Sequence, residues 1–410
     1  MTEQAKVPAI RFAGFTDPWE QRKLGDVASS FDYGLNAAAT EYDGQNKYLR
    51  ITDIDDETHE FSKSDLTTPL ADLAMSADYL LKEGDLLFAR TGASVGKTYL
   101  YRQFDGMVYF AGFLIRARIG EGADPEFAYQ ATLTDAYKKY VAITSQRSGQ
   151  PGVNAQEYAD YQLMLPSKTE QQQIGMTLRS LDDLITLHQR KYDKLVIFKK
   201  SMLEKMFPKD GESVPEIRFA GFTDPWEQRE LVDIAEIVGG GTPDTNNSNY
   251  WDGDIDWYAP AELGNNIYAE SSTRKITQAG FDSCSTKMLP ADKTILFTSR
   301  AGIGNTAILR HSACTNQGFQ SLVIGDADVY FVYSMSERIK KWAEEKASGS
   351  TFLEISGRQL ETMPVNLPSL VEQQAIGSFF SHLDDLITLH QRKLELLQDI
   401  KKSLLDKMFA

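Results

Sequence analysis

Short runs of β-branched and aromatic residues, bounded by Gly, Asp and Asn, mark the first part of the chain. They predict strands over residues 48–54, 85–90 and 108–119, and another short strand near 161–165. Before that last strand, Asp124 is a good helix N-cap and Pro125 a good first helical residue, and apolar residues at helical spacing continue over 127–141. The pattern predicts a mixed, strand-rich α+β domain.

A long helix is predicted next over residues 169–207, which contain no Pro and no Gly after Gly175. Apolar residues recur there at heptad spacing, and the same pattern returns over 380–408. One histidine and one lysine interrupt each seam, at His188 and Lys199 in the first and at His390 and Lys401 in the second. We interpret the histidines as polar interruptions that fix the register, because no second His, Cys or carboxylate pair supports a metal or acid–base site.

A second apolar stripe lies outside this seam. It consists of Leu184 and Leu187, repeated as Leu386 and Leu389. A two-helix coiled coil needs only its a/d seam, so the extra apolar face indicates that further helices pack on it. We favour a separate protein partner over self-association.

The chain is a tandem repeat. IRFAGFTDPWEQR at residues 10–22 recurs letter for letter at 217–229, and LDDLITLHQRK at 181–191 recurs at 383–393. The expected organisation is a globular domain over 1–167, a long helix over 168–208, a linker over 209–216, a second globular domain over 217–369 and a second long helix over 370–410.

Between these shared blocks the copies diverge. FARTGASVGKT at 88–98 corresponds to FTSRAGIGNT at 297–306. A conserved frame around a diverged interior is expected of two modules that do the same job on different targets.

Composition sets the broad class. The 410 residues are 42% hydrophobic, 11% aromatic and 25% charged, which indicates a folded protein of more than one domain. Cys284 and Cys314 provide neither a disulfide framework nor a zinc site. No run is apolar enough to span a membrane, and the start MTEQAKVPAI lacks a signal-peptide pattern. A cytoplasmic protein without a metal, a cofactor or a membrane partner is expected.

Charge restricts how the chain could bind nucleic acid. The net charge of −15, from 43 Lys and Arg against 58 Asp and Glu, disfavours a nonspecific coating of DNA. Any contact with DNA must therefore be local.

Signals for catalysis are weak. GASVGKT at 92–98 is one residue short of a phosphate-binding loop and runs into the strand-like TYLY. DPW at 17–19 and at 224–226 lacks the second Pro of the adenine-methyltransferase tetrad. No paired carboxylates or Ser/His/Asp set recurs in both copies, so a binding protein is predicted rather than an enzyme.

Several strings carry a family resemblance over essentially the whole chain. RFAGFTDPWEQRKLGD opens a copy, SRAGIGNT and NQGFQSL stand at 299–306 and 316–322, and LPSLVEQQAIG leads into LDDLITLHQRK. With these strings in this order, the chain resembles the specificity (S) subunit of a type I restriction-modification system. The resemblance implies two target recognition domains that each read one half of a bipartite, asymmetric site in double-stranded DNA, and two helices that pair antiparallel as a spacer.

The same resemblance implies partners. Two adenine-methylating modification subunits would bind the helices, restriction subunits would complete the nuclease, and the S subunit itself would have no catalytic activity. The alternative is a coiled-coil scaffold that joins two partners without reading DNA.

Direct readout of bases needs Arg, Lys, Asn, Gln or Ser on exposed loops, where they pair with the edges of G or A. All of these residue types are also common in turns and helix caps. The candidates in the first domain are Arg90, Lys97, Ser145, Gln146, Arg147, Gln150 and Asn154, and those in the second are Ser299, Arg300, Asn305, Asn316, Gln317, Gln320, Ser350 and Thr351.

Overall fold

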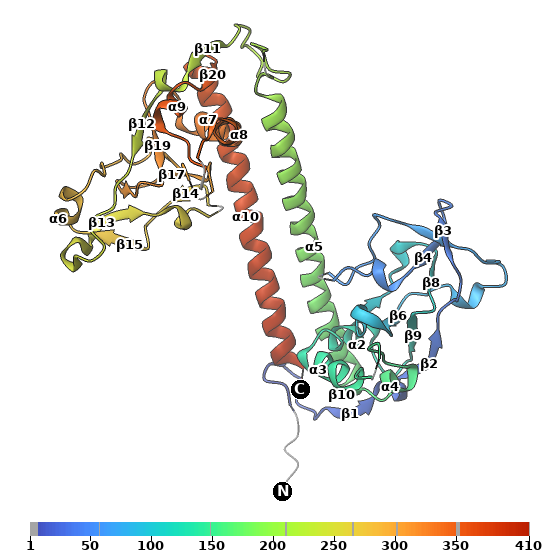
Figure 1. Cartoon of the computed structure of the whole chain (residues 1–410). Coiled ribbons are helices and arrows are strands. Elements are labelled where there is room, and N and C mark those ends of the chain that lie inside the picture. Colours follow the sequence, from blue (N-terminus) through green and yellow to red (C-terminus); the bar gives the residue numbers. More distant parts are fainter. Residues whose placement is uncertain are drawn as a thin grey trace. The chain divides into compact units, whose positions relative to one another are not determined.

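The computed structural model describes residues 7–56, 58–147, 149–209, 211–264, 266–300, 302–349 and 353–409. The chain forms two compact units, one of Met1–Lys191 with His390–Ala410 and the other of Tyr192–Leu389. Each unit contains one globular domain and one segment of each long helix, α5 (Lys168–Lys205) and α10 (Leu370–Met408), which Figure 1 labels. The domain limits expected from the sequence follow the repeat rather than these contacts.

A four-stranded antiparallel sheet forms the centre of the first globular domain. Its order is β2–β9–β6–β7, and the apolar run of β6 is buried at every residue. Three pairs of strands surround it, of which β4 with β8 is parallel. The bounds are β1 Glu20–Lys23 with β10 Gln162–Leu165, β3 Ala39–Glu41 with β5 Thr67–Pro69, β4 Lys47–Leu49 with β8 Val108–Phe110, and β2 Ala28–Tyr33, β6 Asp85–Ala89, β7 Thr98–Leu100 and β9 Leu114–Ile119 in the sheet.

The strands predicted over 85–90 and 161–165 are confirmed as β6 and β10. The prediction over 48–54 is wrong in its second half, because Asp53 accepts hydrogen bonds from both the backbone and the guanidinium of Arg50 and closes a 3-10 turn there. The prediction over 108–119 joined two strands, since the chain turns between them and Leu114 N–H donates to Ala111 O at 2.8 Å.

The helix predicted over 127–141 begins as expected. Asp124 accepts from Phe127 N–H at 3.0 Å and Pro125 is the first helical residue of α2 (Pro125–Ala131). The helix is nevertheless interrupted, because Thr134 donates its hydroxyl to Ala131 O and then caps α3 (Asp135–Thr144). The shorter helices α1 (Leu24–Val27) and α4 (Ala155–Ala159) complete this domain.

Two mixed sheets form the second globular domain. The larger has the order β12–β19–β16–β17–β14, and the smaller β15–β13–β18. The bounds are β12 Ala235–Gly239, β19 Gln320–Ile324, β16 Thr294–Phe297, β17 Thr306–Leu309, β14 Tyr268–Ala269, β15 Arg274–Ile276, β13 Trp251–Tyr258 and β18 Cys314–Thr315, with β11 Glu227–Glu230 paired to β20 Pro364–Leu367 and helices α6 Gln278–Asp282, α7 Val329–Ser334, α8 Ser336–Lys346 and α9 Gly357–Glu361.

Seven 3-10 turns connect these elements in the described part of the chain: η1 Ile51–Asp53, η2 Ala77–Tyr79, η3 Gly92–Ser94, η4 Gln103–Asp105, η5 Leu231–Asp233, η6 Ser248–Tyr250 and η7 Pro260–Glu262.

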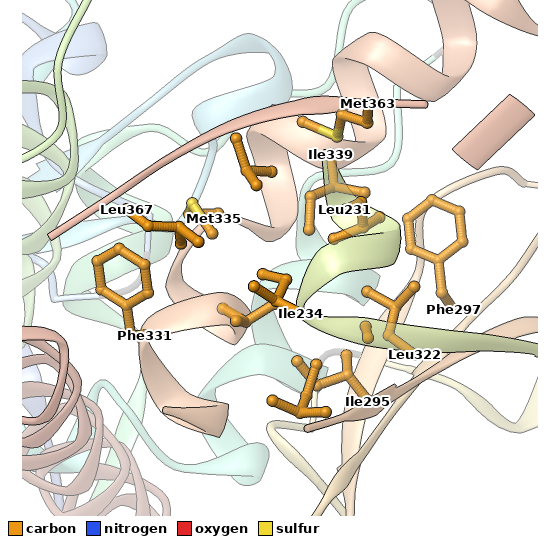
Figure 2. Close-up of a cluster of buried hydrophobic side chains, with 14 of the residues drawn as sticks. Leu231, Ile234, Ile295, Phe297, Leu322, Phe331, Met335, Ile339, Met363 and Leu367 are labelled. Atoms are coloured by element: carbon orange, nitrogen blue, oxygen red, sulfur yellow. The ribbon is translucent and has the colours of Figure 1, made fainter. Parts of the chain in front are cut away.

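The core of the second unit lies between the larger sheet and α7, α8 and β20. Figure 2 shows Leu231 and Ile234 between Phe331 on one side and Phe297 on the other. All four side chains are at most 2% exposed. Burial of such large apolar groups is the main source of the stability of each unit.

The shared sequence blocks build the same frame twice. Arg11 donates two hydrogen bonds to Glu170 at 2.8 and 2.7 Å, and Arg218 does the same to Glu372 at 2.7 Å each. These bonds raise the pKa of both arginines above its usual value. Both carboxylates are 1% exposed, so each motif is anchored to the first turn of the following helix.

Within each unit, α5 and α10 segments run antiparallel. In the first unit, Asp182 pairs with Lys401 at 2.5 Å and His188 contacts His390. In the second unit, Lys199 pairs with Asp384 at 2.5 Å. The two lysines of the seams are thus held by carboxylates from the repeated LDDLITL motif. The α+β class and the long paired helices are therefore confirmed.

Candidate nucleic-acid interface

One end of the first domain's sheet gathers candidates from two distant stretches of sequence. Arg90 follows β6, and its carbonyl accepts from Val153 N–H at 2.9 Å. A further backbone bond joins the two stretches, from Gly92 N–H to Pro151 O at 3.0 Å, and within the second stretch Gly152 N–H donates to Ser145 O at 3.1 Å. The loop over 145–154 therefore lies beside the turn that begins at Arg90.

The second domain repeats this arrangement. Ser299 follows β16, its carbonyl accepts from Ile355 N–H at 3.1 Å, and its own N–H donates to Gly318 O at 2.8 Å. The segments 299–305 and 316–320 are thereby brought together. Ser350 and Thr351 lie outside the described residues.

Several candidates in the first domain are engaged with neighbouring residues. Arg147 donates to the carboxylate of Glu157, and Asn154 caps α4 by accepting from Glu157 N–H at 2.9 Å. Lys97 forms an ion pair with Asp56. Ser145 is buried, whereas Gln146 and Gln150 are exposed. A DNA contact by Arg147 or Lys97 would therefore have to compete with an existing ion pair.

Arg90 is held differently. Its guanidinium carbon lies 5.1 Å from the ring centroid of Tyr33 and 5.9 Å from that of Phe113. The two rings are 44% and 55% exposed. Sequence reasoning missed both aromatic residues, because strand patterns place large aromatic side chains in the core and give no sign that these two stay at the surface.

In the second domain the candidates differ in access. The Ser299 side chain is fully buried and its hydroxyl oxygen has no hydrogen-bond partner among the described residues. Asn316 accepts from Gly318 N–H at 2.7 Å, and Gln317 accepts from the Thr242 hydroxyl. Arg300, Asn305 and Gln320 are half-buried.

The apolar stripe on the helices is exposed. Leu184 and Leu187 are 43% and 45% exposed, and Leu386 and Leu389 are 44% and 45% exposed. Side chains of this size at matching places in both copies leave an apolar face on each helix within its own unit.

The helix seam contains the two histidines. His188 Nδ1 lies 2.7 Å from His390 Nδ1, so one ring must donate and the other accept. Partial burial, followed by the neighbouring charges Lys191 and Lys393, lowers the pKa of His188. For His390, burial comes first and His188 itself adds to the lowering of the pKa.

Among the residues that the structure describes, no group of three or more His, Cys, Asp or Glu side chains could hold a metal ion. No helix among the described residues combines the length and the apolar character needed to cross a membrane.

Known proteins share this architecture. A likeness covers 98% of this chain and 99% of the crystal structure of the type I restriction-modification system S subunit from M. genitalium, with a TM-score of 0.65 and 15% sequence identity, which shows the fold alone. Two relatives come from Methanocaldococcus jannaschii. The type I restriction enzyme MjaIX specificity subunit is 36% identical over 190 residues, which is 45% of this chain and 44% of the relative.

The putative type I restriction enzyme MjaX specificity subunit is 25% identical over 407 residues, which is 96% of this chain and 93% of the relative. The family model described as the type I restriction modification DNA specificity domain matches residues 16–196 and again 223–399. The scaffold alternative is not favoured by these likenesses. Because both copies match, the chain belongs to the family of type I restriction-modification specificity subunits and carries two DNA specificity domains in tandem.

Proposed function

We propose that this chain reads a bipartite, asymmetric target in double-stranded DNA, with one half-site for each globular domain. One observation carries the proposal. The two domains keep an identical frame but present different side chains at the same end of the sheet, where Arg90 in one domain corresponds to Ser299 in the other. Two identical readers would select a palindrome, whereas two different readers select an asymmetric site.

The proposed base contacts come mainly from amide and guanidinium side chains at the ends of the two sheets. The exposed glutamines Gln146, Gln150 and Gln317 offer amide groups suited to adenine. Arg90, Arg147 and Arg300 offer guanidinium groups suited to guanine. Lys97, Asn154, Ser299, Asn305, Asn316 and Gln320 complete the proposed set among the described residues.

Two modification (adenine methyltransferase) subunits are proposed to dock on the helices, and restriction subunits to join them, in the cytoplasm. Leu184 and Leu187 form the proposed docking face in the first copy, and Leu386 and Leu389 form it in the second. The net charge of −15 supports binding of DNA together with these subunits, because a strongly acidic chain needs other subunits to supply cations to the DNA backbone. The chain itself is proposed to catalyse nothing.

A gel-shift titration tests the proposal. The purified chain, with and without its modification subunits, is mixed with target-bearing DNA and with scrambled DNA. The proposal expects target-specific retention that strengthens when the modification subunits are present. Equal retention of both DNAs by the complete complex would contradict the proposal, and would favour a scaffold that does not read sequence.

The docking face has its own test. Leu184→Glu with Leu187→Glu should weaken binding of a modification subunit, because charges replace an apolar face. Lys200→Glu, an exposed change elsewhere on α5, serves as the matched control.

A further inference from the structure

Arg90 stands apart from the other arginines in the described part of residues 7–167. Each of the others has a carboxylate partner, and these are Arg11, Arg22, Arg50, Arg102, Arg116, Arg118 and Arg147. No hydrogen bond or ion pair joins the Arg90 guanidinium to the described residues, and its buried Nε is without a partner among them. Its neighbours are the rings of Tyr33 and Phe113 instead.

The backbone fixes all three residues at one end of the sheet in which β2, β9 and β6 are neighbouring strands. Tyr33 is the last residue of β2, Arg90 follows β6, and Phe113 precedes β9, the strand between them. Arg90 N–H donates to Phe113 O at 3.0 Å, and the Tyr33 hydroxyl accepts from Ala155 N–H at 3.2 Å. The guanidinium is therefore held beside two partly exposed residues, and its terminal N–H groups have no partner among the described residues.

We propose that Arg90 reads a guanine in the half-site of the first domain, with Tyr33 and Phe113 as positioning residues. This inference rests on the proposed function. A guanidinium presents two parallel donors that match O6 and N7 of guanine in the major groove. Aromatic contacts restrict the orientation of the guanidinium and so reduce the entropy lost when it binds.

Among the described residues, the second domain lacks this device at the equivalent place. Ser299 occupies the place of Arg90, since both carbonyls accept from the residue that precedes a helix N-cap. Gly318 takes the place of Phe113, because its carbonyl accepts from Ser299 N–H as that of Phe113 accepts from Arg90 N–H. Gly239 takes the place of Tyr33.

The correspondence of Gly239 with Tyr33 rests on the glycine that follows each of them, Gly240 and Gly34. A Cβ on Gly34 would lie 2.1 Å from Ala111 O, and one on Gly240 would lie 2.1 Å from Asn316 O, so both turns require glycine at the same point. A guanine contact from this place in the sheet is therefore assigned to the half-site of the first domain only.

The test compares variants of the full chain assembled with its modification subunits, by adenine-methylation sequencing and by binding at several salt concentrations. Arg90→Ala should relax one G·C position of one half-site, with a loss of preference for guanine of roughly 5- to 150-fold. Arg90→Lys should stay relaxed, because an ammonium group cannot form the bidentate contact. Phe113→Ala should relax the same position partly, and Phe113→Tyr should retain the preference.

Arg22→Ala is the matched control, since Arg22 is an exposed arginine paired with Glu20 on β1. Equal weakening at all sequences, with rescue by Arg90→Lys, would identify a phosphate contact and overturn the inference. An unchanged target would overturn it too. If Arg90→Ala does not fold, Arg90→Lys decides alone. A wild-type complex without any bipartite target would instead refute the proposed function itself.

Discussion

The two globular domains agree where they meet the helices and differ where their sheets end. Arg11 and Arg218 lie in sequence blocks that are identical, and each forms the same bidentate pair with a buried glutamate, Glu170 or Glu372. At the sheet end, Arg90 beside two aromatic rings corresponds to a buried Ser299 beside glycines. One scaffold therefore holds unlike surfaces at the end of its sheet, because the residues that fix the backbone are separate from those at the sheet end.

Exchanging the first domain should have the largest effect on this comparison. Residues 10–165 are replaced by the corresponding part of another specificity subunit, which should change one half-site completely and leave the other intact. Methylation sequencing of cells that also express the modification subunits measures this. A change in both half-sites would mean that the domains are not independent readers.

Removing the buried glutamate of the bidentate pair should lower the free energy of unfolding by the same amount in both copies. Glu170→Ala leaves Arg11 largely buried without its partner, and Glu372→Ala does the same to Arg218. Each change should lower the free energy of unfolding of its unit by about 3–5 kcal/mol. Urea unfolding checks this, with Glu20→Ala in an exposed pair as the control. Clearly unequal losses of the free energy of unfolding would show that the two bidentate pairs do not stabilise their units equally.

Removing the phenylalanine that follows each long helix should lower the stability of the two units by unequal amounts. Phe207 is 3% exposed and contacts Trp226, Phe331 and Phe380. Phe409, its counterpart in the repeat, is half-buried and contacts Phe127. Phe207→Ala should cost about 3–5 kcal/mol and Phe409→Ala a smaller amount, because less apolar surface is lost. Thermal unfolding that ranked them the other way would contradict this packing account.

The smallest effect should come from the histidine pair. The pKa of His188 and of His390 is lowered in the folded chain from 6.5. At a pH between the folded pKa values and 6.5, the unfolded chain therefore binds more protons than the folded chain. The contribution to stability is present above about pH 6.5 and is lost as the pH falls through the folded pKa values. Unfolding of the wild type and of His188→Asn with His390→Asn at pH 7.5 and 5.5 tests this. The variant should lose less stability on acidification, and an equal loss would assign the pH dependence to other groups.

Sequence patterns predicted the frame, but not which residues surround the proposed base-reading candidates. Heptads, the Asp124 cap and the repeated blocks express local rules or exact repetition, so the long helices and the two copies were visible at once. The break between α2 and α3 depends on hydroxyl groups of Thr132 and Thr134 that bond to the preceding turn, and apolar spacing carries no sign of it.

The Arg90 surface depends on contacts between residues far apart in the chain. Arg90 is predicted from its residue type and its place in a turn, whereas its neighbours Tyr33, at the end of β2, and Phe113, just before β9, lie far from it in the sequence. Lys97 and Arg147 are predicted as base-reading candidates on loops, and each has a carboxylate beside it in the structure. Spacing along the sequence does not reveal which charges a fold will pair.

Sequencing of methylated adenines in cells that express this chain with its modification subunits decides whether the two domains read different half-sites. We expect one bipartite target with two different half-sites separated by an unread spacer of constant length. A palindromic target, a single uninterrupted target or methylation without sequence preference would contradict the proposed function.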